Sequence, residues 1–434
     1  MGEATLSMTG RLAGKRPLLA LVAGFLAAVL ALTLCVPDAA TGKRGEGNEL
    51  RVATYNLQDV RTEDVKRDDN PRLRELAATI QRIRPDVILL NEIAYDQQGV
   101  PGVEPGDAEG QNARRFAENY LAAPQEPGLA PVRYEDFMRP TNTGIASGQD
   151  LDNSGEAVTE YPPPPPTQPD GSPGEQTPGG MAYGNDAYGF GTFPGQYGMG
   201  LLVRPRYEIQ EEEARTFRNF LWKDMPGALL PEDPETGESF YSEKELEVFR
   251  LSSKSHWDVP VRVPGGDTVH LLASHPTPPV FDGPEDRNGR RNHDEIRFLG
   301  DYVSGADYIY DDSGKRGGLD EDEPFVILGD LNDDPDEGDS AGNPVEDFLF
   351  SNERVNGEFV PLAQEPDPDL DPSDTATFGL RADYALPSTG LPVMRGGIRG
   401  HTALYEGGIY EDAPTDHFPV WLDLEAAKRG SGPR

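Results

Sequence analysis

Basic residues are scarce in this sequence relative to acidic ones. The 434 residues include 39 lysines and arginines against 76 aspartates and glutamates, a formal net charge of −37 at pH 7. Because nucleic-acid affinity comes largely from cationic side chains that neutralise phosphates, such a surface repels a polyanion on average. The composition argues against a general nucleic-acid binder, although it is compatible with a local basic groove. It suits a soluble protein in a salty or calcium-rich exterior.

Cysteine and long apolar runs are also nearly absent. Cys35 is the only cysteine, so no internal disulfide can form. The one long apolar run extends from Leu18 to Val36 and follows the basic residues Arg11, Lys15 and Arg16. This is the layout of an export signal. The run is also long enough to cross a bilayer once as an uncleaved anchor.

The N-terminal layout leaves three interpretations open for residues 1–40. Ala39 and Ala40 supply small residues but no clean Ala-x-Ala cleavage site, and Leu34 before Cys35 is bulkier than a lipid-attachment motif prefers. Residues 1–40 are therefore a cleaved signal, a membrane anchor or a lipoprotein signal, and 41–48 form a polar linker. All three predict a secreted or cell-surface protein that contacts a membrane only through this segment. We expect a monomer.

From residue 49 on, strand-like and helix-like patterns alternate. Leu50, Val52 and Thr54 alternate with polar residues, which predicts a strand. Apolar residues recur every three or four positions from Pro71 to Arg84, which predicts a helix that Pro85 ends. A second helix is predicted around 296–302. Further strands are predicted at 87–90, 200–203, 269–274, 325–328, 384–386 and 418–422.

Between residues 122 and 194 this pattern is interrupted. The segment is rich in proline and glycine and contains the unbroken run Pro162–Pro166, which indicates an irregular, mobile insertion. No internal repeat is present. Strands from both ends of the chain mixed with a few helices predict one α/β (α+β) domain of two sheets over residues 49–424. Residues 425–434 are expected to be a flexible tail.

Polar residues of the kind that phosphate chemistry needs follow most predicted strands or lead into them. Carboxylates, amides and histidines delivered by separate strand ends to one rim are a common way to assemble an active site. In this sequence the polar residues at the ends of predicted strands are Asn56, Glu92, His275, Asp330 and Asn332 within Gly329–Asn332, Asp383, and the pair Asp416 and His417.

The order Asn, Glu, His, Gly-Asp-x-Asn, Asp, Asp-His resembles the motif series of the endonuclease/exonuclease/phosphatase superfamily of metal-dependent phosphoesterases. The resemblance covers about 50–424 without the insertion, and the N-terminal layout adds the expectation of a secreted bacterial type. It implies a four-layered sandwich of two packed β-sheets flanked by helices. It also implies a divalent metal, usually Mg²⁺, with Mn²⁺ as an alternative.

The resemblance also implies roles for these residues. Glu92 is expected to be the main metal ligand. Asn56 is expected to help hold the metal or the phosphate, and Asp416 to accept the metal or a bridging water. Asp330 is expected to orient or deprotonate the attacking water, and Asn332 to bind a phosphate oxygen. The remaining three residues act on the developing charge and the leaving oxygen. His417, oriented by Asp383, is expected to stabilise the charge or polarise the nucleophile, and His275 to act near the leaving oxygen.

Two local patterns go beyond the motif series. Arg287, Arg290 and Arg291 form a basic cluster in an acidic protein, and guanidinium groups suit phosphate oxygens, although ion pairs with nearby aspartates explain the cluster equally well. Asp150–Gly155 resembles the start of a calcium loop, but its final Glu ligand is missing. A structural Ca²⁺ there and a plain acidic turn are both open.

The function expected from these patterns is hydrolysis of a small or head-group phosphoester by an activated water outside the cytoplasm. A secreted endonuclease is the first alternative, with nucleic acid a less favoured substrate because of the acidic charge. A non-catalytic calcium-dependent surface module is the second. The intact set of Glu92, Asp330, Asn332, Asp416 and His417 argues against a decayed enzyme.

Overall fold

The structure, a computed structural model, describes residues 49–265, 267–401 and 413–426. The expectations for residues 1–48, including Cys35, and for 427–434 lie outside these ranges. Within them, no helix has the length and apolar character needed to cross a bilayer.

The first sheet has six strands in the order β11-β12-β1-β2-β4-β3. Its neighbours are antiparallel except β1 and β2, which are parallel. The strands are β1 (Glu49–Val60), β2 (Val87–Ile93), β3 (Glu135–Phe137), β4 (Met199–Val203), β11 (Val393–Ile398) and β12 (Val420–Glu425). Strands from the two ends of the domain thus pair directly.

The second sheet has the strand order β10-β9-β8-β7-β5, and β6 also pairs with β7. Only β8 and β9 are parallel. The strands are β5 (Glu208–Ile209), β6 (Arg215–Thr216), β7 (Trp257–Arg262), β8 (Thr268–Ala273), β9 (Phe325–Asp330) and β10 (Asp383–Pro387). All the strands predicted above are present, and β3, β5, β6, β7 and β11 are additional to them.

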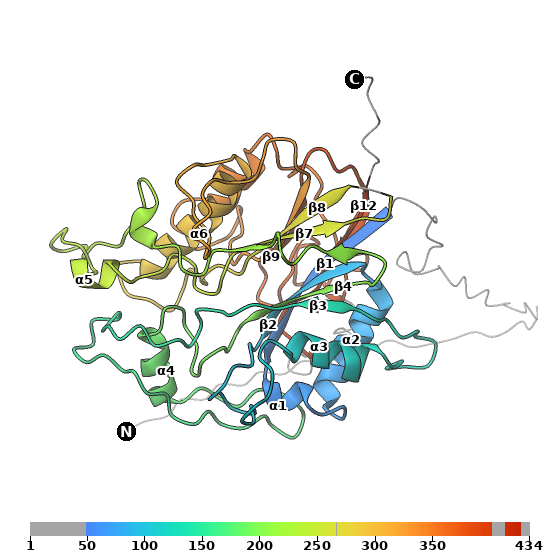
Figure 1. Ribbon diagram of the computed structural model, residues 1–434, viewed down its shortest axis with the longest axis horizontal. Coiled ribbons are helices and arrows are strands. Elements are labelled where there is room, and N and C mark those ends of the chain that lie inside the picture. The colour runs from blue at the N-terminus through green and yellow to red at the C-terminus, as the bar shows by residue number, and fades with distance from the viewer. Residues whose placement is uncertain (1–48, 266, 402–412, 427–434) are drawn as a thin grey trace, which may run out of the picture. The chain divides into compact units, whose positions relative to one another are not determined.

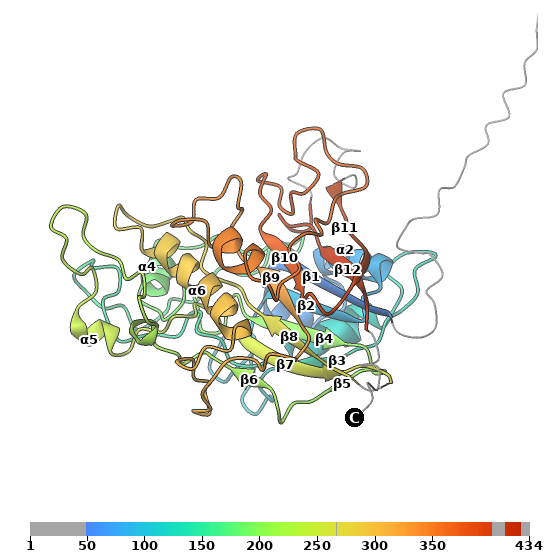
Figure 2. The same cartoon turned by 90° about the horizontal axis from the view of Figure 1, so that it is seen from above.

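Helices cover the outer faces of the two sheets (Figures 1 and 2). The first sheet packs against α2 (Pro71–Ile83) and α3 (Asn112–Phe116), and the second against α6 (Arg287–Val303) and a π-helical turn at Val345–Phe350. The result is the expected α+β sandwich of four layers. The remaining helical segments are α1 (Thr62–Val65), a π-helical turn at Ala117–Leu121, α4 (Pro178–Asn185), a 3₁₀ turn at Trp222–Asp224 and α5 (Glu243–Leu246).

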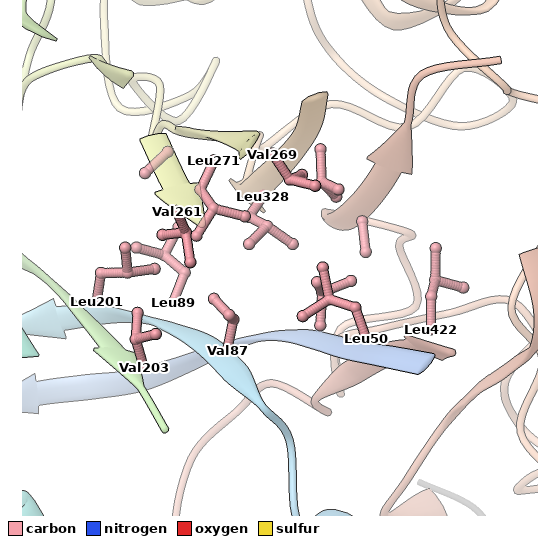
Figure 3. Packing of buried hydrophobic residues seen from close by; sticks show 14 of the residues in the cluster. Leu50, Val87, Leu89, Leu201, Val203, Val261, Val269, Leu271, Leu328 and Leu422 are labelled. Atoms are coloured by element: carbon pink, nitrogen blue, oxygen red, sulfur yellow. The ribbon is translucent and has the colours of Figure 1, made fainter. Parts of the chain in front are cut away.

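The central core lies between the two sheets (Figure 3). Leu50 and Val52 of β1 point into it, while Ala53 and Tyr55 point to the helix side, because successive side chains of a strand alternate between faces. Figure 3 shows such alternate residues on β2 (Val87 and Leu89), β4 (Leu201 and Val203) and β8 (Val269 and Leu271). This alternation decides which polar residues meet at the end of the sandwich.

The segment 122–194 contains one short strand, β3, and one helix, α4; most of its remaining residues have no regular secondary structure. The segment is nevertheless tied to the rest of the domain. The guanidinium of Arg61, just after β1, donates hydrogen bonds to the carbonyl oxygens of Pro165 and Gly174 and pairs with Asp59. The Pro162–Pro166 run is therefore held near the end of the first sheet.

Candidate active site

Four of the predicted site residues reach one place because they continue the alternation of the core. Asn56 has the same parity as Leu50 and Val52, and Asp330 has the same parity as Val326 and Leu328. His275 and Asp383 likewise continue the inward-facing positions of β8 and β10. All four are at least 97% buried. They close the polar end of the space between the sheets.

Glu92 reaches the same cluster by a different route. Its parity on β2 would turn it toward the helix side, but its φ of +61° places it in the left-handed region, and the pairing of β1 with β2 is irregular there. Such a conformation costs a non-glycine residue on the order of 1–2 kcal/mol. Backbone strain of this kind collects at functional sites, where the surrounding structure enforces it.

Asp330 follows a glycine because there is no room for a side chain at position 329. A Cβ atom at this position would lie 1.9 Å from the carbonyl oxygen of Ser274. Strands β8 and β9 therefore approach closely only because residue 329 lacks a side chain. This close approach sets Asp330 and His275 side by side, with His275 Nε2 3.6 Å from Asp330 Oδ2.

Asn56 links the two sheets at the site. Its Nδ2 donates to Glu92 Oε1 at 3.1 Å on the neighbouring strand and to Asp330 Oδ2 at 2.9 Å on the opposite sheet. The second oxygen of Glu92 accepts a hydrogen bond from the backbone N–H of Asp59 at 3.0 Å. The two carboxylates are thereby oriented before any ligand binds.

Burial raises the pKa of Glu92 to about 7, and the negative charges of Asp416 and Asp330 add to the shift, while Asn56 and His417 oppose it. Asp416 is the most open of the predicted site residues, with 41% of its side chain exposed. Glu92 and Asp416 therefore share a field of uncompensated negative charge.

Asp383 and His417 form a close pair. His417 Nδ1 lies 2.8 Å from Asp383 Oδ2, and its Nε2 points toward Asp330 Oδ2 at 3.7 Å and Asp416 Oδ1 at 3.9 Å. Burial alone lowers the pKa of His417, but Asp383 and Asp330 outweigh it and raise the pKa well above its ordinary value. The ring is thus held as an imidazolium aimed at the centre of the cluster.

His275 has the opposite charge state. Burial lowers its pKa well below the ordinary value, and the nearby positive charges of Lys254 and His417 lower it further. Its Nδ1 is buried and has no hydrogen-bond partner among the described residues. The two histidines therefore supply one neutral and one charged ring. We call Asn56, Glu92, His275, Asp330, Asp383, Asp416 and His417 the catalytic cluster.

Asn332 lies at the edge of the catalytic cluster. It adopts a left-handed backbone with φ of +52°, and its N–H donates to Asp330 Oδ1 at 3.0 Å. Its side-chain Nδ2 donates to the carbonyl oxygen of Pro276 at 3.2 Å, which leaves the amide oxygen as its acceptor.

Two buried residues belong to the site although no sequence motif marks them. Lys254 donates to Pro276 O at 3.2 Å, and burial lowers its pKa. Glu295 of α6 accepts hydrogen bonds of 2.6 Å from the N–H groups of Ser253 and Thr277. It fixes the two loops that carry Lys254 and His275. For Glu295, the only available signal of a role in the site was a buried glutamate on an otherwise amphipathic helix.

The three arginines of the basic cluster have different surroundings. Arg287 pairs with Glu285, and Arg290 donates to the Leu230 carbonyl. Arg291 is buried and donates to the carbonyl oxygens of Leu251, Tyr188 and Arg250. Arg287 and Arg291 line a cavity that also reaches Glu92, His275 and Asp416, whereas Arg290 is not part of its lining. The hydrogen bonding of Arg291 makes it a support of the cavity wall.

The Asp150–Gly155 turn supplies no residue of the catalytic cluster, although its Leu151 lines the same cavity. Oxygens of Asp150, Asp152 and Asp186 come within 4.8 Å of one another. These carboxylates already accept hydrogen bonds from backbone or side-chain groups, such as Ser154 N–H and Leu151 N–H.

The donor atoms of the catalytic cluster fit a hard divalent cation. Glu92 and Asp416 offer carboxylate oxygens, which Mg²⁺ prefers, and the amide oxygen of Asn56, which accepts the Gln58 N–H at 2.9 Å, has a second lone pair for a cation. A cation there would also offset the repulsion that raises the pKa of Glu92. A second set within 4.8 Å joins Asp330, Asp383 and His417, but the 2.8 Å bond between Asp383 and His417 commits those two residues to each other.

A sequence model described as the Endonuclease/Exonuclease/phosphatase family matches residues 53–417, a segment that spans the whole catalytic cluster. No curated protein sequence matches the chain.

Similar solved structures include an endonuclease/exonuclease/phosphatase from Beutenbergia cavernae DSM 12333, at 18% identity and a TM-score of 0.46 over 87% of this chain and 72% of that one. Another, from Bacteroides vulgatus, has 13% identity and a TM-score of 0.40 over 87% and 99%. The human Nocturnin catalytic domain with bound sulfate has 12% identity and a TM-score of 0.41 over 87% and 94%.

Proposed function

The chain belongs to the endonuclease/exonuclease/phosphatase family, and on this premise we propose that it hydrolyses a small or head-group-sized phosphoester with the help of a divalent cation. The observation that carries the proposal is the catalytic cluster, in which two oriented carboxylates and two buried histidines meet at one end of the sandwich. A non-catalytic module has no use for such a costly set of buried charges.

The chain's own residues divide the chemistry among them. Asp330, held by Asn56 and the N–H of Asn332, accepts a hydrogen bond or a proton from the attacking water. His417, fixed by Asp383, places positive charge where negative charge develops on the phosphoryl oxygens. The neutral His275 lies beside Asp330, near the leaving oxygen, and the amide of Asn332 orients the phosphate.

Glu92, Asn56 and Asp416 would hold the metal. When bound, a divalent cation at these residues offsets charge on the transferring phosphoryl group. Mg²⁺ is the first choice because all three donors are oxygens, and Mn²⁺ fits the same set. The amino-terminal run Leu18–Val36 adds the proposal that the enzyme works outside the cytoplasm.

The proposal of a small substrate follows from the acidic net charge of the chain. With 76 acidic and 39 basic residues, the chain has little positive surface to track consecutive phosphates. In the cavity wall, Arg287 is paired with Glu285 and Arg291 is bonded to backbone carbonyls, so neither is a free clamp for a long polyanion.

The test compares plasmid DNA, a bis-aryl phosphodiester and an aryl monophosphate, each with Mg²⁺, Mn²⁺ or Ca²⁺. We expect a small ester to be hydrolysed with kcat/KM that changes less than about twofold between low salt and ~0.2 M NaCl, because few phosphate contacts are screened. Rapid plasmid nicking at low salt that ~0.2 M NaCl suppresses would instead identify a nuclease.

A further inference from the structure

The cavity that Glu92, His275 and Asp416 line extends well beyond the catalytic cluster. Its volume is about 650 Å³, within the range of sites for drug-sized ligands. Most of the rest of its wall comes from the insertion, including α4, from Tyr241 and Phe249, and from 277–291. Figures 1 and 2 both show α4 and α5 on the left of the domain, beyond the sandwich.

Apolar side chains are exposed toward this cavity in unusual number. Seven large apolar residues are exposed in the described ranges, and three of them, Met181, Phe190 and Phe281, line this one cavity. Phe281 is 89% exposed and also has a left-handed backbone, with φ of +67°. A bulky residue that is both strained and exposed to water gains nothing for folding, which points to a ligand.

The polar groups of the wall exclude a chain of phosphates. The wall includes the acidic residues Asp59 and Glu175, and its two arginines are already bonded to protein groups. Two further lining residues, His275 and Thr277, each carry a buried polar atom without a hydrogen-bond partner among the described residues. Polar anchoring is thus available beside the catalytic cluster, and apolar surface lies farther along the wall.

We propose that this cavity, the apolar chamber, binds the uncharged apolar group of the phosphoester and thereby selects the substrate. This inference rests on the proposed function, because the phosphate must occupy the catalytic cluster. Met181, Phe190 and Phe281 are its specificity-determining residues. The ligand is one phosphate that carries an alkyl or aromatic group, in contrast to a polynucleotide.

Binding of non-hydrolysable alkylphosphonates to the full chain with Mg²⁺ tests the proposal without turnover. From methyl- to hexylphosphonate, affinity should rise roughly two- to fourfold per methylene, as expected for burial of apolar surface. Naphthylmethylphosphonate distinguishes an aromatic group from a chain: tighter binding than octylphosphonate assigns an aromatic alcohol, and weaker binding assigns an alkyl one. Either result supports an apolar ligand.

Met181→Ala and Phe281→Ala should each weaken octylphosphonate binding about five- to tenfold, the scale expected for a lost side-chain contact, and leave methylphosphonate unchanged. Met394→Ala is the matched control, because Met394 is similarly exposed, 44% against 47% for Met181, and lies on β11 outside the chamber. Equal affinity for methyl- and octylphosphonate, equal effects of Met181→Ala and Met394→Ala, or tighter binding of a nucleoside monophosphate would each overturn the proposal.

The outcome also separates this inference from the proposed function. Chain-length-dependent binding without hydrolysis of any phosphoester would retain the apolar chamber and refute the hydrolase. Hydrolysis with a KM independent of the size of the alcohol would retain the hydrolase and refute the chamber.

Discussion

The catalytic cluster stands on the ends of strands, whereas the apolar chamber beside it is walled largely by loops and the short helix α4. In the cluster, Asn56 orients both Glu92 and Asp330, and Asp383 orients His417. In the chamber, Met181, Phe190 and Phe281 are exposed and Phe281 is strained. The difference indicates that chemistry and selectivity reside in separate parts of the fold, which can be altered independently.

The largest effect is expected from the Asp383 and His417 pair. Because Asp383 fixes the charge and orientation of His417, Asp383→Asn should lower kcat nearly as far as His417→Ala, on the order of 10²-fold or more. The double variant should add little, since residues that act as a unit are not additive. Steady-state rates on a small phosphoester measure this.

The control for that experiment is a second histidine–aspartate pair outside the cluster. His270 Nδ1 lies 2.6 Å from Asp258 Oδ1 on the second sheet, away from the cavity. His270→Ala should keep kcat within about threefold once the folded fraction is matched, as expected for a change outside the site. Multiplying losses in the Asp383→Asn, His417→Ala double variant would show that the two residues act independently.

An intermediate effect concerns stability and needs no substrate. The pKa of Glu92 rises from 4.5 to about 7 on folding, chiefly because of burial. A raised pKa favours the folded state below pH 4.5, and this contribution is lost as pH rises through 7. Without metal, the protein should therefore lose on the order of 1–3 kcal/mol of stability between pH 4.5 and 8 through this group.

Thermal unfolding of wild type and Glu92→Gln in EDTA across this pH range measures the loss. The wild type should become relatively less stable than the variant as pH rises, and Mg²⁺ at pH 8 should stabilise only the wild type. Parallel curves for the two proteins, or equal stabilisation by Mg²⁺, would contradict the assignment of Glu92 to a metal.

The fold was largely predictable because its strands are apolar and bounded by turns. Strands such as β2 and β9 stood out, but β11 did not, since Val393–Ile398 contains two glycines and borders the partly exposed edge of its sheet. The cluster was predictable for a related reason: short motifs such as Gly329–Asn332 sit directly after buried runs. Strand alternation brings Asn56, His275, Asp330 and Asp383 together, whereas Glu92 also needs its left-handed backbone.

The chamber could not be predicted, because its residues come from loops whose path depends on distant contacts. Nothing near Phe281 or Met181 in the sequence indicates a shared cavity, and Arg290 could not be told from Arg287 or Arg291 by spacing alone. Glu295 was missed for the same reason, since it becomes part of the site only through tertiary hydrogen bonds.

The smallest predicted effect tests how the insertion is held against the catalytic side. Arg61 is buried, and it bonds Pro165, Gly174 and Asp59. Arg61→Ala should free the Pro162–Pro166 region and speed its cleavage by a broad-specificity protease about five- to tenfold, because local opening becomes easier.

Arg67→Ala is the matched control for that variant. The Arg67 side chain is 56% exposed and forms a surface ion pair with Asp69 at the longer distance of 3.6 Å. Mapping of the first cuts by mass spectrometry decides the outcome. First cuts within the strands that carry the cluster, with the insertion intact, would show that the insertion is not the weakly held part.

The central claim is that the strand-end cluster is a metal-dependent hydrolytic centre, and one assay tests it most directly. The full chain, stripped of metal, is given a bis-aryl phosphodiester with and without added Mg²⁺, beside Glu92→Gln and the control Glu118→Gln, an exposed residue outside the cavity. We expect wild type and Glu118→Gln to be inactive in EDTA and restored by Mg²⁺, with Glu92→Gln at least ~10²-fold slower, as for loss of an essential charged group. Full activity in excess EDTA, or an unaffected Glu92→Gln, would contradict the account.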